Sequence, residues 1–243
     1  DNSPVVCEPY IQWVIEDHYE TGRPHWEYVG VKFVSDVAPF ERMKIRLLNG
    51  GHSLLGIIGS LCQYKTIDET VNDPILRVFL REFMDLEVTP ILGVIEGVNL
   101  EDYKDSLIQR FGNKHIKDQL SRICSQSSAK LPKFLIPTIR EQLEIGGPIK
   151  KGTFILAAWC RYLELAGTSG YDYEVVDEMQ MVLKEGAKAS ASDDKLAFLK
   201  ISAVFGDLVH SKQFVETYLT LIENIRKHGV IQVMELTFNR LCS

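Results

Sequence analysis

The amino-acid sequence predicts a mainly α-helical protein that is preceded by two short β-strands. Residues 10–16 and 28–34 are rich in aromatic and β-branched side chains, which favour strands. From about residue 38 onward, apolar residues recur with the spacing of an α-helix. Hydrophobic residues make up 45% of the 243 positions and charged residues 25%, as in an ordinary soluble domain with a substantial core.

The two predicted strands cannot form a stable sheet by themselves, because a two-stranded sheet is marginal in water. We therefore expect a partner domain that supplies further strands. The predicted division is residues 1–37, the end of that partner domain, and residues 38–243, the helical domain. The chain begins Asp1-Asn2-Ser3-Pro4, with no initiator Met and no signal-like segment, which suits either the middle of a longer protein or a processed N-terminus.

Capping residues and glycine-rich breaks divide the helical part. A long helix is predicted from about Pro39 to Cys62. Asp73-Pro74 places a cap before a first-turn proline, and Asn99 opens a helix that ends near Phe111. Further helices are predicted near residues 113–124, 130–145, 148–166, 173–188, 209–227 and 229–240.

The small polar residues of Ala187–Asp194 are expected to form a surface loop. Trp13, Trp26 and Trp159 are expected to lie in the core.

Charge, cysteine spacing and missing motifs exclude several function classes. A net charge of −6 argues against general nucleic-acid binding, and no run of about 18 apolar residues predicts a membrane span. The five cysteines are far apart and form no C-x-x-C pair, which indicates free thiols in a reducing compartment such as the cytoplasm and no zinc cluster. Neither G-x-G-x-x-G nor G-x-x-x-x-G-K-[ST] occurs, so any nucleotide must be held mainly by another part of the protein.

The candidate chemistry lies in the long helix, where Lys44, Asn49 and His52 interrupt a stretch otherwise suited to burial. On a regular α-helix, at about 100° per residue, Asn49 and His52 lie about 140° and 80° from Lys44 around the axis. The three side chains therefore share one side of the helix.

The same segment contains four glycines, each of which costs a helix about 1 kcal/mol relative to alanine. They are Gly50, Gly51, Gly56 and Gly59. Such a cost is tolerated where a ligand, a cofactor ring or a crossing helix approaches the backbone closely.

Each of these residues also has an ordinary structural explanation. A lysine near a helix start is most often a solvated surface residue, and a histidine on an apolar helix is most often a core residue. An asparagine can simply bond a backbone carbonyl, and glycine-rich helices pack closely without any chemistry. From the residues alone, an active site and a purely structural helix both remain open.

A wider pattern resembles one known family. Lys44-x4-Asn49-x2-His52, within Lys-Ile-Arg-Leu-Leu-Asn-Gly-Gly-His, resembles the signature of the mannitol 2-dehydrogenase family of polyol-specific long-chain dehydrogenases. Glu8-Pro9-Tyr10-Ile-Gln-Trp13-Val-Ile-Glu-Asp17 resembles the family's E-P-x-x-Q-W-V-I-E-D segment. Three further segments are similar, so the resemblance covers nearly the whole chain: Gly22-Arg-Pro24-x-Trp26-Glu27, Leu86-Glu-Val-Thr-Pro90 and Arg122-Ile-Cys-Ser-x4-Lys130-Leu-Pro132.

The resemblance implies a fold and a cofactor. Members of this family have an N-terminal Rossmann domain that binds NAD or NADP, followed by a helical, 6-phosphogluconate-dehydrogenase-like C-terminal domain that carries a catalytic lysine. This chain resembles the second domain together with the last strands of the first. The missing glycine fingerprint and the two isolated strands then have one common explanation.

The resemblance also implies roles for the candidate residues. Lys44 is implied as the general base beside the nicotinamide, Asn49 as a donor to the developing alkoxide, and His52 as a ligand of a substrate hydroxyl that also orients the lysine. Arg122 and Lys130 match the family's substrate contacts beyond the reacting carbon, and no metal is implied. A free amine with a pKa near 10.4 is too basic for such a role, so we expect burial or nearby cations such as Arg46 to lower it to about 7–8.

The implied reaction interconverts a polyol such as mannitol and a ketose. A sugar-acid substrate, with fructuronate reduced to mannonate, is an alternative that no residue decides. A non-enzymatic helical interaction domain with a decayed site is an alternative of another class, against which the intact Lys44, Asn49 and His52 argue. The choice between NAD and NADP stays open, and the resemblance favours a monomer.

Overall fold

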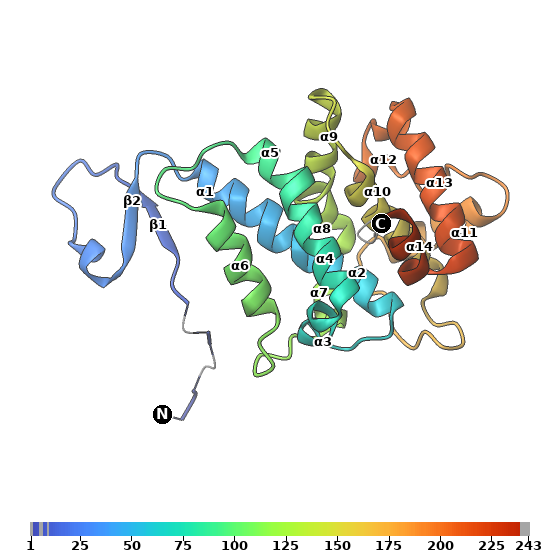
Figure 1. The fold of residues 1–243 in the computed structure, drawn as a ribbon, viewed down its shortest axis with the longest axis horizontal. Helices are drawn as coiled ribbons and strands as arrows, with labels where there is room; N and C mark the ends of the chain where they lie inside the picture. The colour runs from blue at the N-terminus through green and yellow to red at the C-terminus, as the bar shows by residue number, and fades with distance from the viewer. Residues whose placement is uncertain (1, 5–6, 9, 239–243) are drawn as a thin grey trace.

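The structure, a computed structural model, describes residues 2–4, 7–8 and 10–238. It confirms the predicted mainly α-helical fold class with two strands near the N-terminus. In Figure 1 the strands lie at one end of the molecule beside α1 (Ala38–Met43), and the C-terminal helices lie at the other end. The change from strand to helix falls between Val34 and Ala38, next to the predicted domain boundary at residues 37 and 38, which itself stays a prediction.

The strands β1 (Trp13–Glu16) and β2 (Val31–Val34) pair in parallel, with Trp13 opposite Val31. The first residues of the second predicted strand, 28 and 29, belong instead to a 3-10 helix, η1 (Trp26–Val29). Parallel sheets normally have both faces covered. Here the side chains of Trp13 and Trp26 stack on each other and are 54% and 38% exposed, so the prediction that they lie in the core is wrong for this chain by itself.

The predicted long helix is confirmed, but it is not uniform. α1 continues directly into the π-helix η2 (Lys44–Asn49) and then into α2 (Gly50–Leu61). Within α2 almost every residue is buried, because helices surround it, among them α7 (Leu120–Cys124) and α10 (Lys150–Leu165). The remaining helices through residue 144 are α3 (Ile67–Asn72), α4 (Pro74–Phe83), the π-helix η3 (Met84–Val88), α5 (Thr89–Leu92), α6 (Leu100–Phe111), α8 (Ser127–Phe134) and α9 (Ile136–Glu144).

The C-terminal part packs against α10, whose Trp159 is 1% exposed and lies in the core as predicted. Of these helices, α13 makes the most extensive contact with α10. The elements are α11 (Gln180–Ala191), α12 (Ser202–Phe205), the 3-10 helix η4 (Leu208–His210), α13 (Lys212–His228) and α14 (Val230–Thr237). No helix in the described part of the chain is long and apolar enough to cross a membrane.

Several predicted helix limits are wrong. Only residues 120–124 of the predicted helix 113–124 are helical, because the Asn113 side chain bonds the His115 amide instead and Lys117 has a positive φ of 48°. The predicted helix 130–145 is two helices that meet at Leu135, just before a first-turn proline in α9. The predicted helix 173–188 begins only at Gln180.

The predicted loop Ala187–Asp194 is also wrong over most of its length. Helix α11 continues to Ala191, with Ala187 and Ser190 buried. The small side chains let this helix pack closely on α10, where the Ser190 hydroxyl lies 3.5 Å from the Cys160 thiol.

The glycines of α2 serve close helix packing. A Cβ atom on Gly56 would lie 2.6 Å from Ile123 Cγ2 of α7, and one on Gly59 would lie 2.4 Å from Thr70 Oγ1 of α3. Of the three explanations that the sequence allows for this glycine-rich stretch, the crossing helix applies at these positions.

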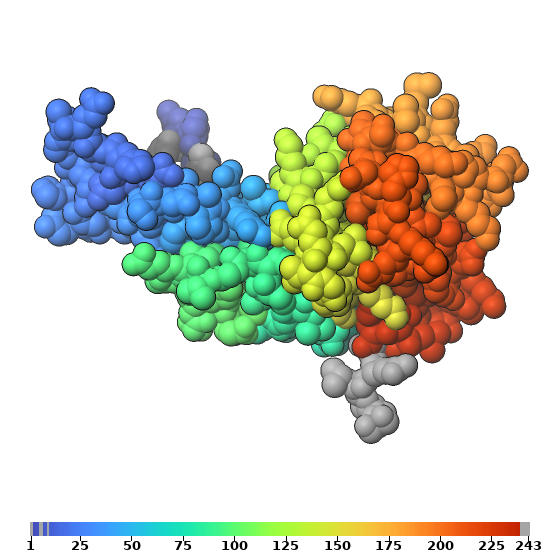
Figure 2. All heavy atoms as spheres, turned by 90° about the horizontal axis from the view of Figure 1, so that it is seen from above, coloured from blue at the N-terminus to red at the C-terminus, as the bar shows by residue number. Residues whose placement is uncertain are grey.

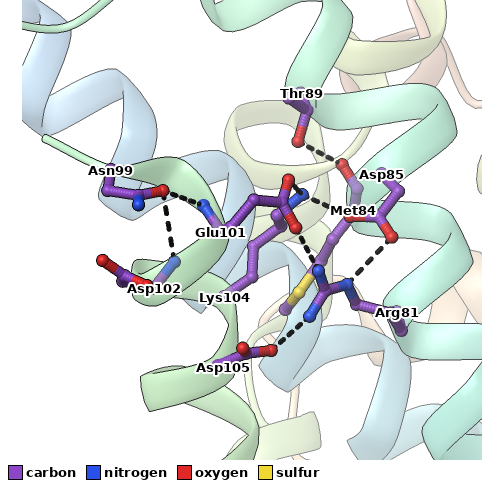
Figure 3. Close-up of polar contacts among 9 residues, drawn as sticks. All are labelled: Arg81, Met84, Asp85, Thr89, Asn99, Glu101, Asp102, Lys104 and Asp105. Atoms are coloured by element: carbon purple, nitrogen blue, oxygen red, sulfur yellow. Dashed lines mark hydrogen bonds and ion pairs between the residues drawn. The ribbon is translucent and has the colours of Figure 1, made fainter.

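A network of charges joins α4 and η3 to α6 (Figure 3). Lys104, which is 1% exposed, donates to Asp85 and, at 2.6 Å, to Glu101. Arg81 donates to Asp85 at 2.8 Å and also to Glu101 and Asp105. The buried amine is thereby matched with carboxylates, and the second π-helix is held against α6.

Candidate active site

The π-helix η2 changes the relative position of the candidate residues. The Gly50 amide donates to the Ile45 carbonyl, five residues earlier, so this turn holds one more residue than an α-helical turn. If the extra residue is taken as a single bulge, Asn49 and His52 lie about 40° and 20° from Lys44 around the axis, instead of about 140° and 80°. The bulge therefore brings the three side chains toward one line along the helix.

Lys44 and Asn49 are available for a ligand. Lys44 is exposed and Asn49 is half-buried. Within the part of the chain that the structure describes, neither side chain forms a hydrogen bond or an ion pair. The space-filling view is hollowed between the blue N-terminal segment and the yellow-green helices, and light-blue atoms of the α1–η2 region lie between them (Figure 2).

His52 lies where α2 reaches the surface. Among Gly50–Leu61, all of which the structure describes, it is the one residue that is only partly buried. Its ring packs on Phe111 of α6, with ring centroids 4.6 Å apart. Burial lowers the pKa of His52 to about 4, so the imidazole is neutral at neutral pH and can accept a hydrogen bond as well as donate one.

Arg122 and Lys130 lie close enough together for the charge of Arg122 to lower the pKa of Lys130. Arg122 is 70% exposed and donates to both carboxylate oxygens of Asp118, at 2.7 Å for one of them. Lys130 donates to the Ile123 carbonyl, at 3.0 Å, near the C-terminal end of α7. Burial lowers the pKa of Lys130, and the nearby Arg122 lowers it further, whereas Asp118 opposes the shift.

Asp118 connects three of the five candidate residues. Its carboxylate pairs with Arg122, and its charge raises the pKa of both His52 and Lys130, against the effect of burial. The backbone of this residue is fixed by the Ile67 amide, which donates to the Asp118 carbonyl at 3.0 Å. Sequence reasoning did not identify Asp118, although an acidic residue four positions before Arg122 is a recognisable pairing signal.

Two further charged residues near His52, Arg110 and Glu8, were also not predicted as site residues. Arg110 lies beside His52 closely enough for its charge to lower the histidine pKa. Its guanidinium donates to Glu8 at 2.9 Å and stacks on the Tyr10 ring at 3.9 Å. The N-terminal segment that resembles the family motif is thus attached to α6 next to the candidate site.

Arg46, named above as a cation near Lys44, is itself paired. It is buried, and its guanidinium lies 2.9 Å from Glu141 Oε1 of α9. Arg42 pairs with the other oxygen of the same carboxylate. The Glu141 carboxylate offsets part of both positive charges, and the expected effect of Arg46 on Lys44 stays a prediction.

Cysteines and acidic residues form no alternative centre in the described residues. Cys7, Cys62, Cys124 and Cys160 are free thiols, and Cys242 lies outside the described residues. Burial raises the pKa of Cys124 and Cys160 to about 12, so these thiols are poor nucleophiles. No group of three or more His, Cys, Asp or Glu side chains in this part of the chain is arranged to hold a metal.

A helical domain beside a parallel strand pair, with Lys44, Asn49 and His52 along one helix, agrees with the helical half of the two-domain dehydrogenases that the sequence resembles. The family model described as "Mannitol dehydrogenase C-terminal domain" matches residues 36–226. The chain therefore belongs to the mannitol dehydrogenase family, of which it represents the C-terminal domain.

Relatives and solved structures agree with this assignment. The chain is 41% identical over 238 residues to a mannitol 2-dehydrogenase of Neosartorya fischeri, covering 96% of this chain and 47% of the relative. A mannitol dehydrogenase of Saccharomyces cerevisiae is 40% identical over 237 residues, covering 97% and 47%. The chain thus spans about half the length of the relatives it matches.

Two solved structures share the fold. A Pseudomonas fluorescens mannitol 2-dehydrogenase in ternary complex with NAD and D-mannitol has a TM-score of 0.85 and 40% identity, covering 96% of this chain and 47% of the other. A D-sorbitol dehydrogenase in substrate-free form has a TM-score of 0.81 and 30% identity, covering 91% and 46%.

Proposed function

We propose that this chain is the substrate-binding and catalytic part of a longer NAD-dependent dehydrogenase that interconverts a mannitol-like polyol and a ketose. One observation carries the proposal. Lys44, Asn49 and His52 lie along one side of a single helix whose π-helical turn reduces the angle between them, and two of them have no competing polar partner among the described residues. Family membership supports the same reaction.

In the proposed reaction, Lys44 accepts the proton of the hydroxyl group on the carbon that is oxidised. Asn49 donates a hydrogen bond to the oxygen as negative charge develops on it, which stabilises the transition state more than the ground state. The neutral imidazole of His52 binds the same or a neighbouring hydroxyl and holds the lysine amine in position.

Arg122 and Lys130 bind the hydroxyl groups farther from the reacting carbon. A polyol presents several hydroxyls in a row, and a guanidinium and an ammonium together offer several donors for them. Asp118 holds the Arg122 guanidinium in place for this contact. The proposed substrate therefore extends from the Lys44 region of the helix toward α7 and α8.

The residues present fit a nicotinamide cofactor that is bound mainly by another domain. When bound, NAD⁺ accepts the hydride that leaves the carbinol carbon. Lys44 is exposed on the side of the helix that a covering domain can reach, and the chain itself has no glycine-rich phosphate loop. NAD is preferred to NADP in this proposal because the Pseudomonas structure is described as a complex with NAD.

The comparisons favour the polyol over the sugar acid, because the relatives named above are mannitol and sorbitol dehydrogenases. They do not favour a non-enzymatic interaction domain.

We propose that the whole protein has an N-terminal Rossmann domain that continues the sheet from β1 and β2 and covers Trp13 and Trp26. We further propose that it works as a monomer in the cytoplasm, where the free thiols stay reduced.

A substrate panel tests the proposal. The full-length protein is assayed with mannitol, sorbitol and other hexitols with NAD⁺ or NADP⁺, and with fructose and fructuronate with the reduced cofactors. We expect NAD⁺-dependent oxidation of a hexitol. Turnover of fructuronate alone would favour the sugar-acid alternative, and turnover of none of these compounds would remove the enzymatic proposal.

A further inference from the structure

Two arginines on either side of Lys44 bind one carboxylate. Arg46 Nη2 lies 2.9 Å from Glu141 Oε1, and Arg42 donates to Glu141 Oε2 and, at 2.7 Å, to the Ile91 carbonyl. The Arg46 side chain is 9% exposed and that of Glu141 is 27% exposed. The Arg46 guanidinium is therefore shielded from water, which strengthens its ion pair with Glu141, whereas Arg42 is 43% exposed.

The spacing of the two arginines sets the direction of Lys44. Arg42 and Arg46 are four residues apart, so they lie on the same face of the helix and reach α9 together. Lys44 lies midway between them in the sequence, and it is exposed where Arg46 is buried, so the two side chains point to different sides of the helix. Ion pairs on one face thus fix the rotation of the helix and hold the lysine on the exposed side.

Helix α9 also holds the second π-helix. The Gln142 side chain, next to Glu141, donates to the Glu87 carbonyl of η3 at 2.6 Å. The Glu87 carboxylate in turn accepts from the Lys151 and Gly152 amides, at 2.6 and 2.7 Å, at the start of α10. The two π-helices contact each other, so adjacent residues of α9 connect both to the core.

We propose that Glu141 is a positioning residue for the reaction, because its pairing with Arg42 and Arg46 sets the rotation and register of the π-helical turn that presents Lys44 and Asn49. Glu141 makes this contribution through the two arginines, without touching the substrate. The inference rests on the proposed function. A general base displaced by about 1 Å lowers the rate by about 100-fold, so a small rotation of this turn is enough to be measured.

The test uses the full-length protein. Glu141→Gln removes the charge that holds both arginines, Glu141→Asp keeps it, and Glu144→Gln, at an exposed position on the same helix, is the matched control. For Glu141→Gln we expect kcat for polyol oxidation to fall about 10- to 100-fold, with KM for NAD⁺ within about twofold of the wild type. We expect kcat of Glu141→Asp to be at least about threefold higher than kcat of Glu141→Gln. We expect Glu144→Gln to match the wild type.

A purely structural role predicts a different result. The melting temperature would fall while kcat per folded molecule stayed at the wild-type value, and that outcome overturns the inference. If Glu141→Gln does not fold, Arg42→Gln replaces it, because Arg42 is 43% exposed and its removal leaves Arg46 paired with Glu141. One of the two ion pairs is then lost, so we expect a smaller fall in kcat, of about 3- to 10-fold. A wild-type kcat in Arg42→Gln then overturns the inference.

The two proposals fail in different ways. An inactive wild-type protein overturns the proposed function and this inference with it. An active wild type that loses turnover in Lys44→Ala but keeps it in Glu141→Gln overturns only the positioning role.

Discussion

The imidazole of His52 packs against the ring of Phe111, with 4.6 Å between the ring centroids. This contact attaches the end of the candidate site to α6, the helix that also carries Arg110. It explains why His52, although it reaches the surface, is buried enough to have a pKa of about 4. The neutral imidazole is therefore a property of how α2 and α6 pack.

The lowered pKa of His52 predicts a pH-dependent stability. The unfolded chain binds a proton at His52 below about pH 6.5, whereas the folded protein resists protonation until about pH 4. Stability from this group is fully present above pH 6.5 and is lost as the pH falls toward 4, by about 3 kcal/mol in total. The Gln side chain of His52→Gln does not titrate. Between pH 7 and pH 4 the wild type should therefore lose about 3 kcal/mol of unfolding free energy relative to this variant.

Urea denaturation of both full-length proteins at a series of pH values measures this difference. A difference that stays constant with pH would show that His52 titrates normally in the folded protein.

Substitutions of Arg122 and Asp118 are predicted to weaken binding of the polyol more than binding of the cofactor. A charge-assisted hydrogen bond is worth about 1.5–3 kcal/mol, so Arg122→Ala should raise KM for the polyol by about 10- to 100-fold. Asp118→Asn should produce a smaller rise of the same kind, because it frees the guanidinium without removing it. Steady-state kinetics with each substrate varied separately gives both KM values, and an equal rise in KM for NAD⁺ would contradict this assignment.

The close packing of α2 predicts a large difference between two glycine substitutions. In Gly59→Ala the added Cβ would lie 2.4 Å from Thr70 Oγ1 and 2.9 Å from Leu120 Cδ1. Thr70 is fully buried and cannot move away, so we expect a loss of about 1–3 kcal/mol and a lower melting temperature. Gly22→Ala, where no atom lies within 4 Å of the added Cβ, should leave the melting temperature unchanged.

The charge network in Figure 3 predicts that Asp85 and Asp105, two partners of Arg81, contribute unequally to the free energy of unfolding. Asp85→Asn leaves the buried Lys104 amine with Glu101 as its one remaining carboxylate in the described network, so we expect a loss of about 2–4 kcal/mol. Asp105 is 70% exposed, and its pair with Arg81 should contribute less than about 1 kcal/mol. Thermal unfolding of Asp85→Asn and Asp105→Asn tests this order, and equal effects would contradict it.

The sequence predicted the parts of this structure that depend on local patterns. The strand–helix division, the long helix Pro39–Cys62 and the caps at Asp73 and Asn99 are all confirmed, because each depends on residues close together in the chain. Helix limits failed where side chains compete locally, as Asn113 does, or where tertiary packing selects small residues, as at Ala187.

The arrangement of the site was less predictable. Hydrophobic periodicity cannot show that one extra residue is inserted between Lys44 and Asn49, because the apolar pattern continues on both sides of the bulge. The pairing of Arg46 with Glu141 joins residues 95 positions apart, which no local pattern can indicate. Asp118 carries a local signal for pairing with Arg122, but no local pattern indicates that the fold brings it near His52 and Lys130.

Lys44 acts as the base in the proposed reaction, and two substitutions of this one residue test that role in the full-length protein. Lys44→Ala removes the amine, and Lys44→Arg keeps the positive charge in a group that does not lose its proton. Lys133→Ala, at another exposed lysine, is the control. Lys44 forms no hydrogen bond or ion pair within the described residues, so both variants should fold with the melting temperature of the wild type. NAD⁺-dependent oxidation of mannitol should fall by at least about 100-fold in both Lys44 variants and stay unchanged in Lys133→Ala. Wild-type turnover in either Lys44 variant would contradict the account.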